Sequence, residues 1–187
     1  MALKLVPLAL PEIIEITPQR FEDERGFFTE SYNHQRFVEH GIDYQWVQDN
    51  HSFSKVKNVL RGLHLQTPDK AQDKLVRVIT GAVFDVAVDV RKGSPNYGNW
   101  VAVTLSAERG NQLLIPAGFA HGFLTLTEET HVAYKVTDYY SAAHEVCLRY
   151  DDPEIGIEWP LSGTHPQLSE KDLRGVNLSD TESGFRY

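Results

Sequence analysis

Apolar and polar residues alternate with a period of two through the middle of the chain. Between Phe84 and Val90, one face carries phenylalanine and three valines, while the other carries Asp85, Ala87 and Asp89. Successive side chains of a strand point to opposite faces of its sheet, so this alternation predicts a half-buried strand rather than a helix. Gly81 marks the turn before it.

Other parts of the chain also show strand-type patterns, over shorter stretches. Apolar and β-branched runs predict further strands at 13–17, 27–32, 99–105, 113–116, 122–126, 130–140 and 145–150, with an extended segment at 45–53. The stretch from His34 to His40, closed by Gly41, predicts one short helix. Turn clusters such as 22–26 and 94–98 recur about every 8–12 residues, which is typical of an all-β sandwich or barrel.

After Trp159 the sequence no longer shows a clear strand pattern. Residues 168–172 predict a short helical turn, and the polar segment 175–187 predicts a loose C-terminal tail. No internal repeat, low-complexity segment or linker divides residues 1–187, a length that suits one domain. A domain of this size buries about 70% of its unfolded surface and needs no disulfide to fold.

Composition narrows the class of protein. The net charge of −8 argues against nucleic acid as a partner. The single cysteine, Cys147, excludes an internal disulfide and a CxxC site, which fits a reducing cytoplasm. The N-terminal apolar run is interrupted by Pro7 and Pro11, and no later run reaches the roughly 18 apolar residues of a membrane span. We therefore expect a cytoplasmic protein without a membrane partner.

Two stretches concentrate the candidate chemistry. The first, from Val59 to Gly81, places Arg61, His64 and Lys74 on or beside predicted strands. The second, from 110 to 123, places His121 behind a Pro-x-Gly turn. We expect these two stretches to form the walls of one pocket.

The second stretch, Gly110-x5-Pro116-x-Gly118-x2-His121, resembles the second motif of the cupin superfamily, a double-sheet jelly roll. The first cupin motif supplies two histidines and a glutamate to a metal.

At those positions this chain has His64, Gln66 and Lys74. Divalent metals prefer neutral histidine and carboxylate ligands, and an ammonium group would repel them. The sequence therefore predicts a cupin barrel without metal, and a metal held by other histidines remains the alternative.

A histidine base, a lysine at oxyanion distance and a phenol form a set suited to removing a proton next to a carbonyl. A positioned general base contributes roughly 10²–10⁴ in rate. A charged donor at the enolate oxygen adds on the order of 3 kcal/mol.

Ten stretches together resemble the dTDP-4-dehydrorhamnose 3,5-epimerase family over about 150 residues. They are EDERGFFTESY (22–32), VQDNHSFS (47–54), VLRGLHLQ (59–66), KLVRV (74–78), GAVFDVAVDVR (81–91), SPNYGNWV (94–101), IPAGFAHGF (115–123), YKVTDYY (134–140), DDPEIGIEWP (151–160) and LSEKD (168–172). The resemblance implies a cupin-type jelly roll with a few short helices and no cofactor.

The resemblance also implies a role for each matching residue. His64 is then the catalytic base, Asp172 the carboxylate that orients it, and Tyr134 the acid that returns a proton from the opposite face. Lys74 is the cation at the enolate oxygen. The implied substrate contacts are Arg25 and Arg61 at the pyrophosphate, Tyr140 stacked on the thymine, and Glu30, Gln48, Asn50, His121, Glu145 and Lys171 elsewhere.

The implied reaction converts dTDP-4-dehydro-6-deoxy-D-glucose to dTDP-4-dehydro-L-rhamnose by inversion at C3 and C5. The implied assembly is a homodimer whose N-terminal segments cross over, and unpaired edges of a jelly roll favour such pairing. A mono-epimerase, a metal-dependent cupin oxygenase and a non-catalytic sugar-nucleotide-binding module remain alternatives.

Other readings of single residues also stay open. His121 fits a turn, the two tyrosines fit aromatic packing on one strand face, and Asp172 fits a surface cap. Asp85 and Asp89 fit either partners of Lys74 inside the barrel or plain surface charges.

Overall fold

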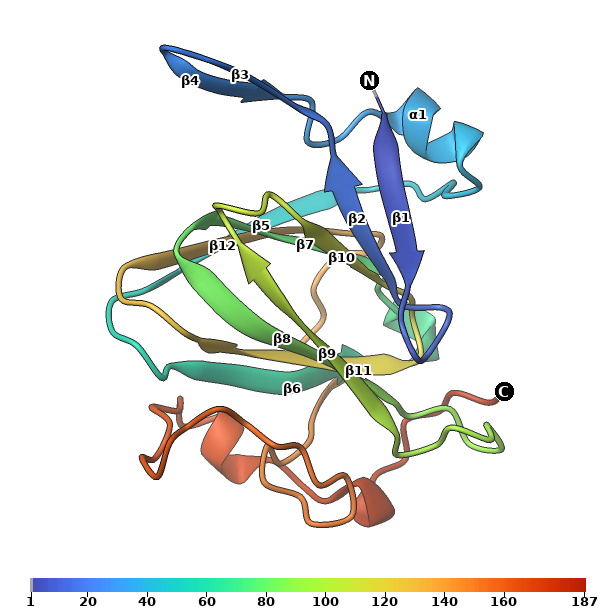
Figure 1. The fold of residues 1–187 in the computed structure, drawn as a ribbon. Coiled ribbons are helices and arrows are strands. Elements are labelled where there is room, and N and C mark those ends of the chain that lie inside the picture. Colours follow the sequence, from blue (N-terminus) through green and yellow to red (C-terminus); the bar gives the residue numbers. More distant parts are fainter. Residues whose placement is uncertain (1) are drawn as a thin grey trace.

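Two β-sheets packed face to face form the body of the molecule (Figure 1). The computed structural model describes residues 2–187. The larger sheet has six strands in the order β1-β2-β10-β7-β12-β5, and the smaller has five in the order β13-β6-β11-β8-β9. This arrangement confirms the prediction of an all-β jelly roll with a few short helices.

The larger sheet consists of β1 (Leu3–Pro7), β2 (Ile14–Pro18), β5 (Gln48–Ser54), β7 (Lys74–Thr80), β10 (Gln112–Ile115) and β12 (Thr130–Val136). The smaller sheet consists of β6 (Leu60–Gln66), β8 (Ala82–Asp89), β9 (Trp100–Ser106), β11 (Phe119–Thr125) and β13 (Glu145–Cys147). A separate hairpin is formed by β3 (Arg20–Asp23) and β4 (Gly26–Thr29). The helical elements are α1 (His34–Glu39) and the 3-10 turns η1 (Pro68–Lys70), η2 (Asp172–Arg174) and η3 (Leu178–Asp180).

The predicted strands and the helix are present with small shifts of their ends. The strand predicted at 130–140 ends at Val136, and β1 is not predicted because its short apolar run contains Lys4 and ends at Pro7. In α1, the Asn33 side chain accepts a hydrogen bond from the Arg36 backbone N–H at 3.2 Å, and Phe37 is buried. Among residues 2–187, no helix has the length and apolar character needed to cross a membrane.

The prediction that β8 is half-buried is wrong, because both of its faces are covered. Its valine face points away from the barrel interior, where Val86 and Val88 pack against Leu148, Ile155 and Leu178 of the C-terminal segment. The central position of β8 in the smaller sheet therefore leaves it no solvated face.

The other face of β8 points into the barrel and carries the two aspartates. Asp85 and Asp89 are both fully buried, so the reading of them as surface charges is also wrong. Asp89 accepts hydrogen bonds from Arg91 Nη2 and from Ser94 Oγ, both at 2.6 Å. A buried carboxylate with such partners avoids most of the cost of desolvation.

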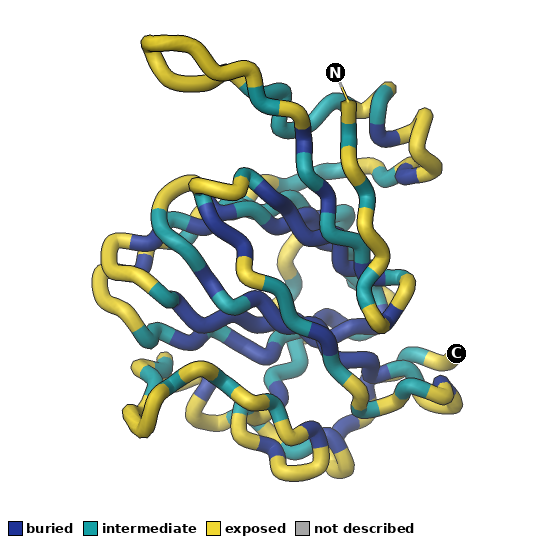
Figure 2. The backbone as a smooth tube through the Cα atoms, in the orientation of Figure 1, coloured by how far each residue is buried: buried dark blue, intermediate teal, exposed yellow. Residues whose placement is uncertain are grey.

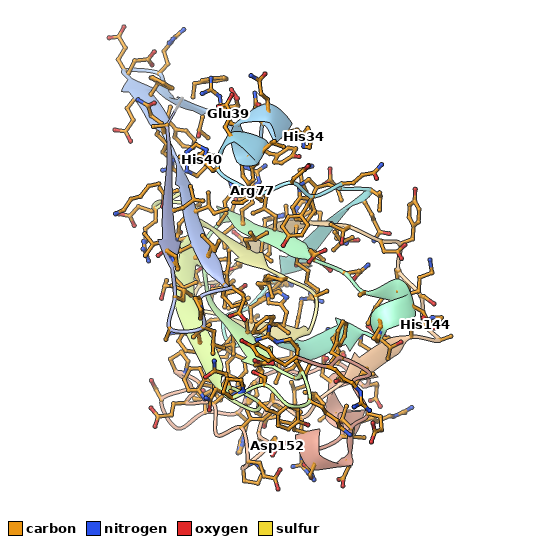
Figure 3. All side chains as sticks on the ribbon, turned by 90° about the vertical axis from the view of Figure 1, so that its right-hand side faces the viewer. His34, Glu39, His40, Arg77, His144 and Asp152 are labelled. Carbon is orange, nitrogen blue, oxygen red and sulfur yellow. The ribbon has the colours of Figure 1, made fainter. Side chains whose placement is uncertain are left out.

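Residues 175–187 do not form the loose tail that their polarity predicts, because they pack under the smaller sheet (Figures 1 and 2). Leu178 is buried and its backbone N–H donates to Asp152 Oδ2 at 2.7 Å, while Ser183 Oγ donates to the Val90 carbonyl at 2.6 Å. Figure 3 shows Asp152 at the opposite end of the molecule from α1. The C-terminal segment is therefore anchored to the core through Leu178, Thr181 and Ser183, while its other residues are partly or fully exposed.

The β3–β4 hairpin projects away from the body and is exposed except at its base (Figures 1 and 2). Its side chains include Phe21, Phe27 and Phe28, which are 45%, 56% and 62% exposed. Three exposed phenylalanines on one short hairpin are unusual for a surface that meets only water.

We expect Leu178→Ala to lower the free energy of unfolding by about 2–5 kcal/mol, because it removes a buried side chain from under β8. Leu173→Ala is the matched control, since Leu173 is 63% exposed whereas Leu178 is 4% exposed. Urea unfolding followed by circular dichroism measures both. Equal effects of the two substitutions would contradict a packed C-terminal segment.

Candidate active site

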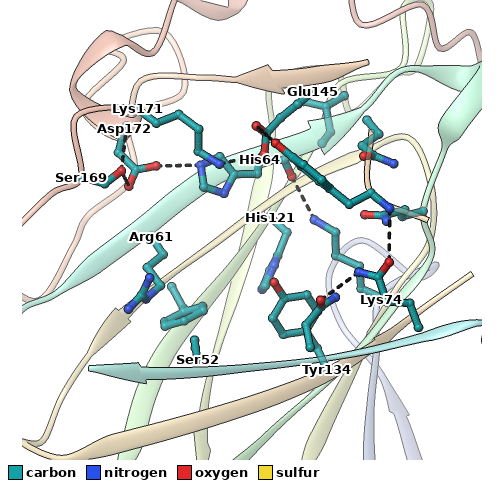
Figure 4. A pocket seen from close by; sticks show the side chains of 17 residues that line it. Ser52, Arg61, His64, Lys74, His121, Tyr134, Glu145, Ser169, Lys171 and Asp172 are labelled. Atoms are coloured by element: carbon teal, nitrogen blue, oxygen red, sulfur yellow. Dashed lines mark hydrogen bonds and ion pairs between the residues drawn. The ribbon is translucent and has the colours of Figure 1, made fainter. Parts of the chain in front are cut away.

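A pocket of about 310 Å³ opens between the two sheets (Figure 4). Its lining includes eleven of the thirteen predicted site residues: Gln48, Asn50, Arg61, His64, Lys74, His121, Tyr134, Tyr140, Glu145, Lys171 and Asp172. The prediction that the stretches 59–81 and 110–123 share one pocket is confirmed. Strands β5 and β12 add a third wall.

His64 lies on β6 and is joined to a residue more than 100 positions later in the chain. Its Nε2 lies 2.7 Å from Oδ1 of Asp172, at the start of η2. Ser169 Oγ donates to the other carboxylate oxygen at 2.6 Å, and the Gly62 backbone N–H donates to Oδ1 at 3.3 Å. Asp172 is buried, so it is not a surface cap.

The electrostatics of this pair favour a neutral imidazole beside an ionised carboxylate. Burial lowers the pKa of His64 below its ordinary value of 6.5, although the hydrogen bond with Asp172 opposes the shift. Burial alone would raise the pKa of Asp172, but hydrogen bonds from His64 and Ser169 outweigh it and hold that pKa at about 2. With its proton on Nε2 facing the carboxylate, the neutral ring carries its lone pair on Nδ1.

Lys74 enters the pocket from the opposite sheet. Its Nζ donates to the His64 backbone carbonyl at 3.1 Å, so the side chain from β7 reaches across to β6. Burial lowers the pKa of Lys74 to about 8, although the carboxylates of Asp85 and Glu145 oppose the shift. A buried ammonium in a pocket attracts negative charge that develops beside it.

Tyr134 lies on β12, on the wall that faces His64 (Figure 4). Burial raises the pKa of its phenol, and the positive charges of Arg61 and Lys171 only partly oppose this. The phenol therefore holds its proton at neutral pH. The pocket therefore presents a neutral imidazole on one sheet and a protonated phenol on the other.

His121 is buried on β11 and is held by the barrel interior. Its Nε2 lies 2.9 Å from Asp85 Oδ1 on the neighbouring strand β8. The hydrogen-bond partner of Asp85 is therefore His121 rather than Lys74. This pairing also shows that His121 is a pocket residue and not only part of a turn.

One end of the pocket is closed by an ion pair and a phenol. Lys171 Nζ donates to Glu145 Oε1 at 2.8 Å, and the Tyr140 hydroxyl donates to Glu145 Oε2 at 3.2 Å. Tyr140 lies beyond the end of β12, so Tyr134 and Tyr140 do not share a strand face as predicted, although both line the pocket. The exposed ring of Tyr140 is available for stacking.

Arg61 and His64 both line the pocket although they are three residues apart on one strand. Simple alternation would place them on opposite faces. The strand is irregular between them at Gly62, which has a φ of +119° and lies so close to Gly122 that a Cβ atom would be 2.6 Å from the Gly122 Cα. Only glycine fits this position.

Some pocket residues were not predicted. Ser52 follows Gln48 and Asn50 on the same face of β5, so alternation alone would have found it. Ser169 orients Asp172 from three positions earlier, a local contact that its place in LSEKD does not reveal.

Cys147 was treated only as an unpaired thiol, yet it is the cross-strand neighbour of His64. Burial raises the pKa of this thiol to about 11, so it is protonated at neutral pH.

Two predicted substrate contacts do not line this pocket. Arg25 lies at the tip of the β3–β4 hairpin, where its guanidinium pairs with Asp23 at 2.5 Å. Glu30 follows the hairpin and accepts a hydrogen bond from Arg36 Nε at 3.2 Å. Within one chain, the structure therefore separates both residues from His64.

The donor set at the cupin metal position does not fit a metal. The Gln66 amide is occupied, since its Nε2 donates to the Lys70 carbonyl at 2.5 Å and its Oε1 accepts from the Ser141 backbone N–H at 2.6 Å. The ammonium of Lys74 stands where a carboxylate ligand is expected. Only His64 and His121 are metal-type ligands at these positions, so we derive no step through a metal there.

Comparisons with known proteins point to one family. The family model described as dTDP-4-dehydrorhamnose 3,5-epimerase matches residues 7–180. A dTDP-4-dehydrorhamnose 3,5-epimerase of Salmonella typhimurium is 56% identical over 169 residues, which cover 90% of this chain and 91% of that protein. One of Pseudomonas aeruginosa is 51% identical over 181 residues, covering 96% and 98%.

A solved structure shows the same architecture with a ligand. The crystal structure of a dTDP-6-deoxy-D-glucose-3,5-epimerase of Legionella pneumophila in complex with dTDP-4-keto-L-rhamnose has a TM-score of 0.94 and 46% identity, covering 100% of this chain and 99% of that one. The family model matches nearly the whole chain, and the Salmonella relative is 56% identical to it. This chain therefore belongs to the dTDP-4-dehydrorhamnose 3,5-epimerase family.

Proposed function

We propose that this protein epimerises C3 and C5 of dTDP-4-dehydro-6-deoxy-D-glucose and so forms dTDP-4-dehydro-L-rhamnose for dTDP-rhamnose synthesis. The observation that carries the proposal is the placement of a base and an acid on opposite sheets across one pocket. His64 comes from β6 and Tyr134 from β12, with the buried ammonium of Lys74 reaching between the sheets (Figure 4).

The first step is removal of a proton from carbon next to the 4-ketone. Nδ1 of His64 takes the proton, and the electron pair left behind moves to the ketone oxygen to form an enolate. Asp172 stabilises the resulting imidazolium through its 2.7 Å contact with Nε2. Lys74 places its charge beside the oxygen, where negative charge develops.

The second step returns a proton to the opposite face of the same carbon. The Tyr134 phenol gives up its proton as the enolate collapses to the ketone, and inversion follows because base and acid lie on different walls. A single base would only restore the starting configuration. Because the 4-ketone lies between C3 and C5, one cation at its oxygen serves both inversions.

The remaining pocket residues suit the two ends of the substrate. The guanidinium of Arg61 is matched to the pyrophosphate oxygens, because its planar donor fork binds phosphate well. The exposed Tyr140 ring is suited to stacking on the thymine. Between these ends, the ligand is held by the pocket residues Gln48, Asn50, His121, Glu145 and Lys171.

We also infer that the working unit is a homodimer in which the hairpin of one chain completes the pocket of the other. The hairpin exposes three phenylalanines and carries Arg25 away from its own pocket. A second groove of about 530 Å³ lies on the outer face of the larger sheet and is lined in part by Tyr32, Leu75 and Ile79. Its lining also includes Asp49, Arg77 and Lys135, so the groove offers a mixed apolar and charged surface on which a second copy can dock.

Such a dimer would account for Arg25 and Glu30, the two predicted substrate contacts that lie outside the pocket of their own chain. In a twofold dimer, each hairpin carries its Arg25 and Glu30 toward the pocket of the partner. A cytoplasmic location is part of the same proposal, and the unpaired thiol of Cys147 supports it.

Proton abstraction is tested by incubating the 4-keto sugar nucleotide with the protein in D2O and following it by NMR. We expect solvent deuterium at both C3 and C5. His64→Ala should slow the exchange by about 10²–10⁴, since it removes the general base. Tyr134→Phe should impair inversion more than exchange, because the base remains.

Deuterium at only one carbon would show a mono-epimerase. Undiminished exchange in His64→Ala would refute the assignment of the base. Circular dichroism of both variants is the control for folding.

The pH dependence of kcat/KM should have a basic limb set by Lys74. Because its pKa is lowered to about 8, its ammonium is lost and activity falls as pH rises through about 8. The acid limb should have its midpoint below pH 6.5, because the pKa of His64 is lowered from 6.5. The imidazole is neutral, and can act as a base, only above its pKa.

Lys74→Met should lose about 10²–10³ in kcat and abolish the basic limb. The raised pKa of Tyr134 keeps that phenol out of this range. A basic limb near 8 that survives in Lys74→Met would contradict the role of the ammonium.

The dimer is tested by mixing two inactive chains, Arg25→Ala and His64→Ala, under conditions that allow subunits to exchange. If Arg25 acts in the partner's pocket, the mixed dimer contains one complete site, and activity should recover to about a quarter of the native value. No recovery, or a sedimentation mass equal to the 21.2 kDa of one chain, would contradict the proposal.

A further inference from the structure

A soft-metal ligand lies next to the pair that carries the proposed chemistry. Cys147 on β13 is directly opposite His64 on β6, so the two side chains share a face of the smaller sheet. The Cys147 Sγ lies 3.9 Å from Asp172 Oδ1. Nε2 of His64, Oδ1 of Asp172 and Sγ of Cys147 all lie within 4.8 Å of one another.

We propose that His64, Asp172 and Cys147 form an inhibitory site for Zn²⁺ or a similar soft divalent ion, which shares only His64 with the cupin metal position and is not needed for the reaction. The effect on turnover rests on the proposed function of His64, whereas binding of the ion does not.

The distances suit this ion. Zn²⁺ binds nitrogen and oxygen at about 2.0–2.2 Å and sulfur at about 2.3 Å, so tetrahedral angles place N and O about 3.4 Å apart and O and S about 3.6 Å apart. The observed separations are 2.7 Å for His64 and Asp172 and 3.9 Å for Asp172 and Cys147. Opening the first and closing the second by fractions of an ångström brings these two pairs to tetrahedral spacing. Nε2 and Sγ lie within 4.8 Å of one another and must come to about 3.6 Å to complete the third corner.

The position of each ligand is fixed by the fold. The pairing of β13 with β6 sets the separation of Cys147 from His64. Asp172 is held by Ser169 and by the Gly62 backbone N–H, the kind of supporting hydrogen bonds that orient metal ligands. His64 and Asp172 also line the pocket, so an ion can enter from it and a water can fill the fourth position.

The charges balance when the ion binds. The Cys147 thiol loses its proton to solvent as the metal–sulfur bond forms, because a coordinating thiol is deprotonated outright. With the carboxylate of Asp172 this gives two negative charges for a divalent cation. The nearby ammonium of Lys171 is already paired with Glu145 at 2.8 Å, which reduces its repulsion of the ion.

Binding at this site prevents His64 from acting as the base. The metal takes Nε2 of His64 and the carboxylate of Asp172, so the ring proton that faced Asp172 moves to Nδ1. Nδ1 then has no lone pair with which to take a proton from the substrate. Arg61, Lys74 and Tyr134 are not ligands and still hold substrate. The ion therefore lowers kcat and leaves KM nearly unchanged.

The site is tested first without substrate, on chelator-treated protein titrated with Co²⁺. A thiolate-to-cobalt charge-transfer band in the near ultraviolet is expected for the native chain and should be absent in Cys147→Ala and Cys147→Ser. Binding of Co²⁺ to the native chain without this band would overturn the proposal, whatever the activity of the variants.

The second arm measures turnover in the presence of Zn²⁺. One equivalent should lower kcat at least about tenfold, EDTA should restore it, and Cys147→Ala should need at least about 10–100-fold more Zn²⁺ for the same loss. His131→Ala is the control, because it disrupts another pair of close imidazoles, His51 and His131, whose ring nitrogens lie 2.9 Å apart.

Unchanged inhibition of Cys147→Ala, or loss of inhibition in His131→Ala, would place the ion elsewhere. If the cobalt band appears in a chain that exchanges no deuterium into substrate, the metal site stands and the proposed function fails. The two claims are therefore separable.

Discussion

The 2.7 Å contact between His64 and Asp172 joins the two parts of this molecule that carry its chemistry. His64 belongs to the barrel, and Asp172 belongs to the C-terminal segment that packs against it. A buried imidazole alone would be a weak support for positive charge, because burial favours its neutral form. The ionised carboxylate offsets that cost at the moment when the ring gains a proton. The segment that covers the smaller sheet therefore also supplies the carboxylate beside His64, the base in the proposed reaction.

The two faces of β8 are reversed relative to a strand in a simple sandwich. A strand in a simple sandwich turns its apolar face inward, but β8 turns Val86 and Val88 outward and Asp85 inward. The outward valines are covered by the C-terminal segment, so their burial is not lost. The inward aspartate orients His121 and faces the ammonium of Lys74. The fold thus keeps an apolar core on both sides of the sheet while leaving charged groups in the pocket.

The sequence predicted the strands, the jelly roll and the joining of His64, Lys74 and His121 in one pocket, because alternation and motif spacing are local signals. It could not show that β8 is covered on both faces, since the cover comes from residues far along the chain. For the same reason the segment 175–187 was misjudged from its polarity, although Leu178 anchors it. Alternation also fails at Arg61, because the backbone at Gly62 leaves the regular strand conformation. The sequence also predicts Arg25 in the pocket, yet the fold places it at the tip of the β3–β4 hairpin, which no local pattern describes.

The central claim is that Asp172 fixes the tautomer of His64 and leaves Nδ1 as the base. Nitrogen NMR of the chain labelled at its histidine rings tests this most directly. At neutral pH the account predicts a neutral His64 ring with its proton on Nε2, and a loss of that fixed tautomer in Asp172→Asn. A proton on Nδ1, or a charged imidazolium at neutral pH in the free protein, would contradict it.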